Sequence, residues 1–235
     1  MIVLQKVTKI FSGDGVETRA LDDVSLRVDS DEFVVVMGPS GCGKSTLLNV
    51  VGMIDTPTSG AYRFDGWDVS NKSEDDLVEL RRKNFGFVFQ SFNLLDDLSV
   101  HDNVELPLIY DDRPKKERRF RVREALELVE LSNRAKHKPR QLSGGQQQRV
   151  AIARAIVCDP KVLLADEPTG NLDSANGAEV MDMLEALSEQ GTTILMVTHS
   201  PANAGRAHRI VTMRDGRAQS CARVGIDEVR LTAAG

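Results

Sequence analysis

The chain has 235 residues, of which 41% are hydrophobic and 28% are charged. These fractions are typical of soluble domains, so global disorder and fibrous repeats are excluded, and the length suits one large domain or two small ones. The chain contains 35 acidic and 30 basic residues, and the resulting net charge of −5 provides no general attraction to nucleic acids or anionic lipids.

The sequence does not indicate membrane insertion or secretion. No apolar run approaches the ~18 residues that a membrane-spanning helix needs. Residues 1–11 alternate like a short strand and lack the charged start and apolar middle of a signal peptide. The three cysteines, Cys42, Cys158 and Cys221, have no metal-site spacing, and their odd number suits a reducing compartment. We therefore expect a cytosolic protein without a membrane span of its own.

The first third of the chain is rich in strands. Residues 2–10 and 21–28 alternate like strands, and the apolar run at residues 33–36 indicates a strand that is buried on both faces. A glycine-rich loop at 38–43 leads into a helix over 44–52, which is followed by another strand over 61–65.

The middle of the chain is mostly helical, and the last third returns to alternating strands and helices. A strand over 85–89 precedes a helix-rich insert, which ends at Lys161. Helices are expected over 75–83, 101–110, 115–130, 144–157 and 174–190, and strands over 161–165, 192–198 and 210–213. Strands that alternate with helices imply a mostly parallel sheet. The tail after Arg217 is weakly patterned.

The glycine-rich loop carries the strongest local signal. Residues 38–45 read Gly-Pro-Ser-Gly-Cys-Gly-Lys-Ser, which fits the phosphate-loop pattern G-x-x-x-x-G-K-[ST] between a strand and a helix. Glycines let backbone N–H groups wrap a phosphate, and the helix N-terminus adds partial positive charge. Lys44 is expected to reach the β- and γ-phosphates, and Ser45 is expected to ligate Mg²⁺. The alternative is a strand–helix turn that matches the pattern by accident.

Two adjacent carboxylates follow the apolar strand at residues 161–165. A carboxylate at the end of a strand near a phosphate loop suits Mg²⁺ binding through water, which we assign to Asp166. Glu167 is then placed to act as general base on an attacking water. The alternative is a strand that ends in solvated acids.

The segment Leu142-Ser143-Gly144-Gly145-Gln146 opens the helix over 144–157. Ser143 is placed as an N-cap, so the helix N-terminus can face an anion. Alone, this would be an ordinary glycine-bearing cap. Together with the two preceding motifs, it makes the chain resemble the ATP-binding-cassette (ABC) ATPases, whose signature is LSGGQ.

The resemblance covers nearly the whole chain and implies an α/β fold. The expected architecture is a P-loop NTPase of the ABC type, with a mostly parallel core sheet, an N-terminal antiparallel β subdomain and a helical insert. Residues 1–235 would form a single ABC ATPase domain. Its nucleotide-binding core would comprise 1–89 and 161–220, and its helical signature subdomain about 90–160.

The resemblance also implies residue roles. ATP and Mg²⁺ are the expected ligands, with Ser45, Gln90 and, through water, Asp166 on the metal. The expected catalytic residues are Glu167, His199, Gln90 and Lys44. The expected ATP-binding residues are Phe11, Gly38, Pro39, Ser40, Gly41, Cys42, Gly43, Lys44, Ser45 and Thr46, joined from a second subunit by Ser143, Gly144, Gly145 and Gln146.

Several smaller motifs support these roles in chain order. Gln90 matches the Q-loop glutamine, and His199 matches the switch histidine that contacts the γ-phosphate and holds the water with Glu167. The segment 171–173 matches the D-loop, which places Asp173 at a dimer interface, although Asp173 could equally cap a helix. Phe11 matches the aromatic residue that stacks on adenine, or is simply a strand residue of the core.

The family resemblance implies a head-to-tail homodimer around two ATP molecules, because every motif is intact. It also implies an integral membrane permease subunit as partner and a peripheral location on the cytoplasmic face of the inner (plasma) membrane. The apolar residues after Gln90 are either a docking surface for that subunit or packed inward; they are Phe92, Leu94, Leu95 and Leu98.

A narrower resemblance, carried by segments 85–90, 103–107, 142–149 and 165–173, is to the ATPases of macrolide-export, lipoprotein-release and cell-division systems. Export is therefore the expected function, and a mechanotransmission or cell-division complex that moves no cargo is the alternative. No nucleic-acid partner is expected, because Glu117 interrupts the basic run 115–123 and the flanking Asp111 and Asp112 add acidic charge, which indicates a solvated helix face.

The chain departs from the family pattern at one position, and at another it carries a cysteine where family members differ from one another. Ser200 stands where many members have Asp after the switch histidine, and little effect is expected because His199 is present. Cys42 stands at a variable loop position, where we expect its thiol to lie close to the bound phosphates.

Overall fold

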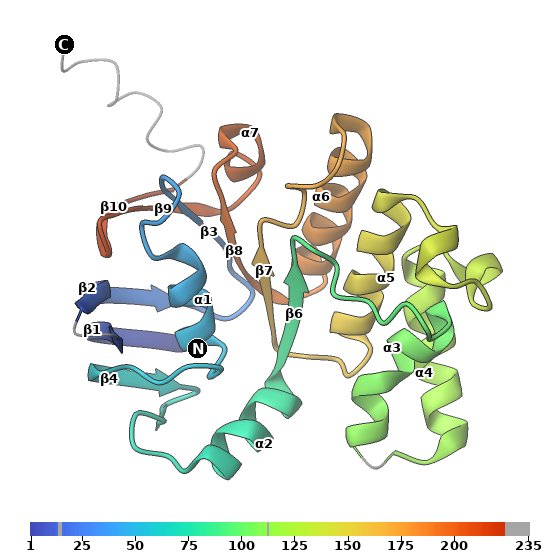
Figure 1. Ribbon diagram of the computed structural model, residues 1–235, viewed down its shortest axis with the longest axis horizontal. Coiled ribbons are helices and arrows are strands. Elements are labelled where there is room, and N and C mark those ends of the chain that lie inside the picture. The colour runs from blue at the N-terminus through green and yellow to red at the C-terminus, as the bar shows by residue number, and fades with distance from the viewer. Residues whose placement is uncertain (14–15, 112, 224–235) are drawn as a thin grey trace.

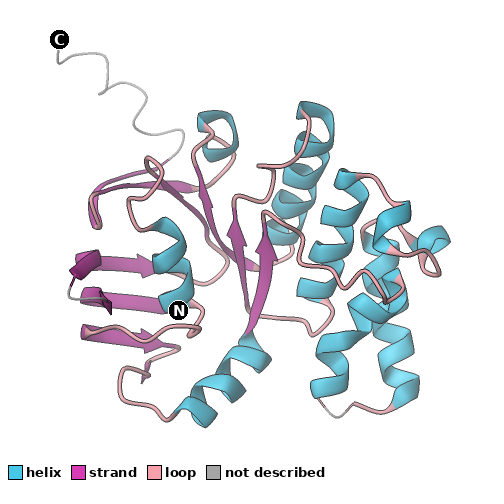
Figure 2. Cartoon of the chain, viewed as in Figure 1, coloured by secondary structure: helices cyan, strands magenta, loops and turns pink. Residues whose placement is uncertain are grey.

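The computed structural model describes residues 1–13, 16–111 and 113–223. Figure 1 shows an antiparallel sheet at one side of the molecule, a second sheet through its middle and a group of helices at the other side. Figure 2 shows that this far side consists mainly of helices and the loops between them. The architecture confirms the expected α/β fold with an antiparallel N-terminal sheet and a helical insert.

The antiparallel sheet has the strand order β2-β1-β4-β5. Its strands are β1 (Ile2–Gly13), β2 (Val16–Val28), β4 (Ser59–Phe64) and β5 (Trp67–Asp68). Ile2 pairs with Val28 on one side and with Phe64 on the other, so the chain start is held in the middle of the sheet. Strands β1 and β2 are both longer than predicted, because polar residues continue the pairing beyond the alternating apolar pattern.

The central sheet has the strand order β10-β9-β3-β8-β7-β6, and only the pair β10–β9 is antiparallel. Its strands are β3 (Phe33–Met37), β6 (Phe85–Phe89), β7 (Val162–Asp166), β8 (Thr193–Thr198), β9 (Arg209–Arg214) and β10 (Arg217–Arg223). The prediction of a mostly parallel sheet is confirmed. The weakly patterned tail contributes the edge strand β10.

Both faces of the central sheet are covered. Val34 and Val36 of β3 belong to an apolar cluster shared with the antiparallel sheet and the helices α1 (Lys44–Val51) and α2 (Glu74–Asn84), whereas Phe33 and Val35 belong to a cluster shared with the helices that follow β6. Successive residues of a strand point to opposite faces, so a strand between two apolar layers is apolar throughout. This explains the unbroken run at residues 33–36.

Seven α-helices and two short 3-10 turns lie in the described residues. The helices are α1 (Lys44–Val51), α2 (Glu74–Asn84), α3 (Val100–Tyr110), α4 (Lys115–Leu128), α5 (Gly144–Ile156), α6 (Ser174–Glu189) and α7 (Pro201–Ala204), and the turns are η1 (Ser132–Arg134) and η2 (Pro139–Gln141). Among the described residues, no helix is both long and apolar enough to cross a bilayer.

Helix α5 begins with a reciprocal cap and a close contact. The Ser143 hydroxyl accepts a hydrogen bond from the Gln146 N–H at 3.3 Å, and Gln146 Oε1 accepts one from the Ser143 N–H at 3.1 Å. A Cβ atom on Gly145 would lie 2.1 Å from Oδ1 of Asn176 in α6, whereas on Gly144 its nearest neighbour would be 3.6 Å away. The second glycine therefore allows α5 and α6 to approach closely, and the first does not serve this purpose.

The two neighbouring glycines provide a matched pair of substitutions. Gly145→Ala should destabilise the nucleotide-free protein by about 1–3 kcal/mol, because Asn176 must move away from the new methyl group. Gly144→Ala should change the free energy of unfolding by less than about 0.5 kcal/mol, because the new methyl group would make only ordinary van der Waals contacts there. Urea unfolding of both variants measures the difference, and equal losses would contradict the assigned contact.

Candidate active site

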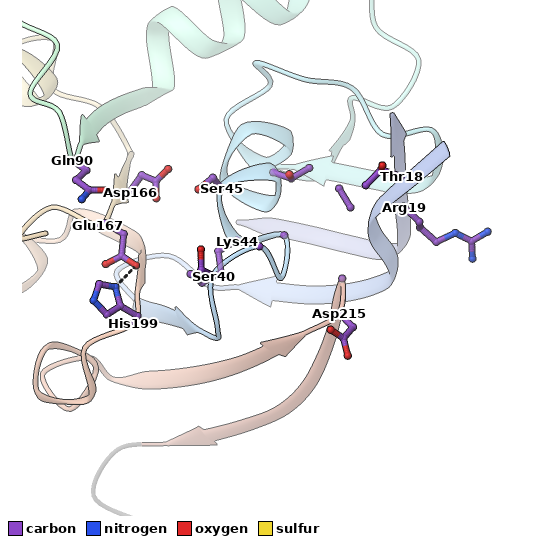
Figure 3. Close-up of a pocket in the computed structure, with 15 residues that line it drawn as sticks. Thr18, Arg19, Ser40, Lys44, Ser45, Gln90, Asp166, Glu167, His199 and Asp215 are labelled. Carbon is purple, nitrogen blue, oxygen red and sulfur yellow. Dashed lines mark hydrogen bonds and ion pairs between the residues drawn. The ribbon is translucent and has the colours of Figure 1, made fainter. Parts of the chain in front are cut away.

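A cavity of about 830 Å³ opens at the carboxyl ends of the parallel strands of the central sheet. A volume of this size is typical of small-molecule sites, and the switch region of an open α/β sheet is the usual place for one. Figure 3 shows polar side chains of the β3–α1 loop in the middle of the site, with one group of residues on each side of them. The residues that line the cavity are Thr18, Arg19, Ala20, Ser40, Gly41, Gly43, Lys44, Ser45, Thr46, Gln90, Asp166, Glu167, His199, Asp215 and Gly216.

The loop between β3 and α1 is built to hold an anion. Helix α1 begins after Gly43, which has φ 100° and provides no side-chain cap, so the first N–H groups of the helix remain available to a ligand. The Lys44 ammonium donates to the carbonyls of Gly38 at 2.8 Å and Pro39 at 2.9 Å. The loop therefore places a positive charge and helical N–H groups at one point of the cavity.

Steric constraints fix the loop at its two ends. A Cβ atom on Gly38 would lie 2.2 Å from the carbonyl oxygen of Met213, and one on Gly43 would lie 2.3 Å from that of Ala20. Gly41 has φ 78° but nothing within 4 Å of a Cβ position, so its side faces open space. Backbone from β9 and β2 thus demands glycine at both ends, and the open space beside Gly41 suits the close approach of a ligand.

Asp166 ends β7 beside Ser45 of the loop. Burial raises the pKa of the Asp166 carboxyl above its usual range; the hydrogen bond from Ser45 lowers it, the neighbouring Glu167 charge raises it and the Lys44 charge lowers it. A carboxylate and a hydroxyl are hard oxygen donors of the kind that Mg²⁺ prefers. The cost of keeping Asp166 charged in this half-buried place would be relieved by a cation.

Glu167 is held in a strained conformation by three contacts. Its φ of 46° lies in the left-handed region, which non-glycine residues seldom adopt because the Cβ atom is crowded there. Its N–H donates to the Val197 carbonyl at 3.0 Å. Its Oε1 lies 2.9 Å from His199 Nδ1, and its Oε2 accepts a hydrogen bond of 3.1 Å from the Thr198 hydroxyl. The two side-chain contacts fix the carboxylate at the cavity, and Figure 3 shows the one with His199.

Gln90 follows β6 and is bound to the loop after Glu167. Its Nε2 donates to Asn171 Oδ1 at 3.1 Å, and Asn171 Nδ2 donates to the Gln90 carbonyl at 2.9 Å. A Cβ atom on Gly170 would lie 2.8 Å from Gln90 Nε2, so this contact depends on glycine as well. Because the amide nitrogen serves Asn171, the amide oxygen is the atom of Gln90 that can bind a metal or water.

The structure brings ten of the predicted site residues together around the cavity. Gly38 and Pro39 contribute through the carbonyls that accept from Lys44. The predicted residues that line the cavity are Ser40, Gly41, Gly43, Lys44, Ser45, Thr46, Gln90, Asp166, Glu167 and His199.

Phe11 is close to the cavity but does not line it. It pairs across β1 and β2 with Thr18, which does line the cavity, and its side chain is 45% exposed. The ammonium of Lys9 lies 4.9 Å from the centre of the ring. Stacking of Phe11 on adenine stays a prediction.

The thiol of Cys42 is not beside the cavity, which corrects the expected position. Cys42 is 3% exposed and belongs to the apolar cluster between α1 and the antiparallel sheet. Its sulfur lies 2.6 Å from where a Cβ on Gly38 would be. The loop turns this side chain inward, so only the backbone of Cys42 can take part in phosphate binding.

The signature residues lie outside the cavity. Ser143 is exposed at the N-terminus of α5, and the N–H groups of Gly144 and Gly145 occupy the first turn, where a helix has no internal acceptors for them. Because Ser143 Oγ accepts the Gln146 N–H, its own hydroxyl hydrogen can be donated elsewhere. Asp173 caps α6 by accepting from the Asn176 N–H at 2.9 Å, which fits the alternative given for it.

Sequence reasoning missed the residues that line the far end of the cavity. Thr18, Arg19 and Ala20 come from β2, and Asp215 and Gly216 come from the turn between β9 and β10. These residues carry no motif, and only the meeting of two sheets places them beside the loop. Figure 3 shows Arg19 and Asp215 on the side of the loop opposite to Glu167 and His199.

The loop that follows Gln90 is held through its backbone. Arg154 of α5 donates to the carbonyls of Phe92 at 2.8 Å and Asn93 at 2.5 Å, both of which have positive φ. Asn103 of α3 is fully buried; it accepts from the Leu95 N–H at 2.8 Å and donates to the Leu95 carbonyl at 3.0 Å.

The apolar side chains of the loop after Gln90 divide between the two expected positions, packed inward or exposed to a partner. Leu94 packs against the apolar cluster that Phe33 and Val35 share with the helices, and Phe92 and Leu98 are half-buried. Leu95 is 51% exposed. The loop therefore faces partly inward and leaves one leucine for an outside partner.

Comparison with known proteins identifies the architecture. The sequence profile of the ABC transporter family matches residues 21–170. The chain is 50% identical over 216 residues to an uncharacterized ABC transporter ATP-binding protein of Methanocaldococcus jannaschii, which covers 92% of this chain and 96% of the relative. It is 51% identical over 214 residues to the macrolide export ATP-binding/permease protein MacB 1/2 of Paracoccus denitrificans, but spans only 32% of that relative.

A solved structure extends the comparison to three dimensions. The dimeric post-hydrolysis state of the ATP-binding cassette MJ0796, bound to ADP and Pi, superposes with a TM-score of 0.88 at 44% sequence identity. The match covers 95% of this chain and 99% of the other. The fold therefore agrees over nearly the whole length.

The raised pKa of Asp166 predicts that removing its charge stabilises the folded protein, by an amount that depends on pH. Because the folded protein holds this proton more tightly than the unfolded chain, stability falls as pH rises from the ordinary carboxyl range through the folded pKa. Asp166→Asn should therefore raise the melting temperature of the nucleotide-free protein in EDTA at neutral pH, and the gain should shrink as the pH falls toward that range. An equal rise in melting temperature at neutral pH and in the ordinary carboxyl range would contradict the assigned burial cost. A lower melting temperature of the variant at neutral pH would contradict it as well.

Proposed function

The chain belongs to the ABC transporter family and is an ATPase of that family, and we propose from this premise that it is the ATP-hydrolysing motor subunit of a membrane transporter of the export or lipoprotein-release type. One observation carries the proposal. The nucleotide-side residues meet in one cavity, whereas Ser143 and its glycines lie outside that cavity at an exposed helix N-terminus. Each site is therefore half of a composite site that a second copy completes.

We propose the following roles for the residues of the β3–α1 loop. The first N–H groups of α1 bind phosphate oxygens, and Lys44 exchanges its bonds to the Gly38 and Pro39 carbonyls for bonds to the β- and γ-phosphates. These carbonyls hold the ammonium in place before the nucleotide arrives. Ser40, Gly41 and Thr46 line the same wall of the cavity.

The donor set around Asp166 fits Mg²⁺. Ser45 would ligate the ion directly, Asp166 through water, and Gln90 through the amide oxygen that its contact with Asn171 leaves available. When bound, Mg²⁺ neutralises phosphate charge and polarises the γ-phosphoryl group. The part of this chain is to hold a charged carboxylate at the place where that ion would lie.

Glu167 is the proposed general base. It takes the proton of the attacking water as the water oxygen bonds to the γ-phosphorus and the bond between the β–γ bridging oxygen and the γ-phosphorus breaks. His199 donates through Nδ1 to Glu167, since a carboxylate only accepts. A neutral imidazole has one N–H, so His199 can also donate to a γ-phosphate oxygen only after it gains a proton or releases Glu167.

Two copies would assemble head to tail around two ATP molecules. The Ser143 hydroxyl and the N–H groups of Gly144 and Gly145 would face the phosphates bound to the other copy, with Gln146 holding the cap. Asp173 would lie at the interface through the loop that also carries Asn171. The dimeric structure of the similar cassette MJ0796 with ADP and Pi supports this arrangement.

The proposed partner is an integral membrane permease subunit, with this chain peripheral at the cytoplasmic face of the membrane. The names of similar proteins support it: the M. jannaschii relative is an ABC transporter ATP-binding protein, and the P. denitrificans relative is an ATP-binding/permease protein of which the chain spans about one third. The loop after Gln90, with exposed Leu95, is the proposed contact. We also propose residues 1–89 and 161–220 as the nucleotide-binding core and about 90–160 as the helical signature subdomain of one domain.

A mechanotransmission or cell-division complex that moves no cargo is the alternative, because the same ATPase geometry would serve it. A role on nucleic acid is disfavoured by the pairing of the basic residues of α4. Arg118 pairs with Glu105 at 2.9 Å and Arg121 with Glu117 at 3.0 Å. These ion pairs leave less free positive charge on the helix for phosphates.

Glu167→Gln should separate ATP binding from hydrolysis. The variant keeps the shape of the side chain and loses the base, so hydrolysis should fall at least about 100-fold while ATP binding persists. With hydrolysis blocked, Mg-ATP should shift the variant to a dimer in size-exclusion chromatography, and ADP should not. A variant that hydrolyses ATP at the wild-type rate would exclude Glu167 as the base, and a variant that stays monomeric with ATP would argue against the composite site.

The membrane partner can be captured with the same variant. Tagged Glu167→Gln with Mg-ATP should retain a permease subunit from detergent-solubilised source membranes, and Leu95→Asp should reduce that yield without changing ATP binding. Retention of DNA-repair proteins or ribosomes in place of a membrane protein would contradict the transporter assignment.

A further inference from the structure

The carboxylate of Glu167 has a second donor besides His199. The Thr198 hydroxyl donates to Glu167 Oε2 at 3.1 Å, on the oxygen that His199 does not contact. Thr198 is the last residue of β8 and is 1% exposed. We propose that Thr198 is a positioning residue for ATP hydrolysis, which holds the Glu167 carboxylate in the orientation needed to accept the water proton; this rests on the proposed role of Glu167.

The direction of the hydrogen bond follows from its neighbours. The backbone N–H of Ser200 donates to Thr198 Oγ1 at 3.1 Å, which occupies a lone pair of that oxygen. A hydroxyl carries one hydrogen, and a carboxylate can only accept. The hydrogen of Thr198 is therefore directed to Glu167, and the backbone turn into α7 keeps it there.

The two donors of Glu167 differ in their freedom to move. The side chain of His199 is 72% exposed, and its proposed contact with the γ-phosphate competes with its bond to Glu167. Thr198 is β-branched and lies at the end of β8, a strand hydrogen-bonded on both sides to β3 and β7, so its side chain has little rotational choice. Thr198 thus keeps hold of Glu167 when His199 turns to the nucleotide.

The backbone of Glu167 makes this contact more important. Its left-handed conformation and its N–H bond to Val197 fix where the side chain starts but not how the carboxylate is rotated. Bonds to both oxygens set that rotation and leave further lone pairs for a water. Small misplacement of a catalytic group can cost about 100-fold in rate.

The test compares two substitutions of Thr198. Thr198→Val keeps the shape and removes the hydroxyl, and it should lower kcat by about 10- to 100-fold with KM for Mg-ATP changed by less than about threefold. Thr198→Ser keeps the hydroxyl and should retain kcat within about threefold of the wild type. Loss of kcat in both variants would assign the effect to packing and overturn the proposal, as would a loss confined to KM.

A matched control lies at the other end of the same strand. Thr193 is equally buried, and its hydroxyl accepts from the Asp31 N–H at 3.0 Å, far from the cavity. Thr193→Val should lower the melting temperature by an amount similar to Thr198→Val and leave kcat unchanged. If the two variants lose kcat equally, the loss follows from stability and the proposal is wrong.

A double variant separates this inference from the assignment of the base. Thr198→Val should not lower the residual hydrolysis of Glu167→Gln further, because the hydroxyl acts through the carboxylate. An additional 10-fold loss in the double variant would overturn the inference while leaving the role of Glu167 intact. A Glu167→Gln variant that hydrolyses at the wild-type rate would instead refute the proposed base and, with it, the basis of this inference.

Discussion

The conformation of the β3–α1 loop depends on two backbone carbonyls that leave no room for a Cβ atom. The carbonyl of Met213 closes on Gly38, and that of Ala20 closes on Gly43. One carbonyl belongs to the central sheet and the other to the antiparallel sheet, so the loop is shaped only where both sheets are in place. The N–H groups of α1 and the ammonium of Lys44 point into the cavity because of this enclosure. Nucleotide binding is in this sense a property of the junction between two sheets.

Glu167 connects several elements on one side of the cavity. Glu167 departs from the strand at a left-handed φ, which turns the chain away from β7 toward the segment that contains Asn171. That segment binds Gln90, and Gln148 of the signature helix donates to the carbonyl of Pro168 at 2.7 Å. Glu167 (the proposed base), Gln90 and the signature helix α5 therefore contact one short stretch of backbone.

The fold was predictable where the pattern of side chains reflects burial on one or two faces. The apolar run at residues 33–36 and the helices of the insert follow directly from periodicity. The edge strand β10 could not be predicted in this way, because an exposed edge strand needs no particular pattern of side chains. The site was predictable at Lys44, Asp166 and Glu167, whose chemistry is local in sequence. The inward turn of Cys42 and the lining by Thr18 and Asp215 depend on how distant backbone segments meet, which no local pattern records.

The hydrogen bonds from Arg154 and Asn103 to the backbone of the loop after Gln90 have an evolutionary consequence. Both side chains bind backbone carbonyl and N–H groups, which any residue except proline would present at those loop positions. The side chains of the loop can therefore be exchanged while its attachment to α3 and α5 persists. Leu95, exposed on this loop, is free to vary in a way that the buried Asn103 is not. Exchange of the exposed side chains and preservation of the loop's attachment can thus proceed side by side in one chain.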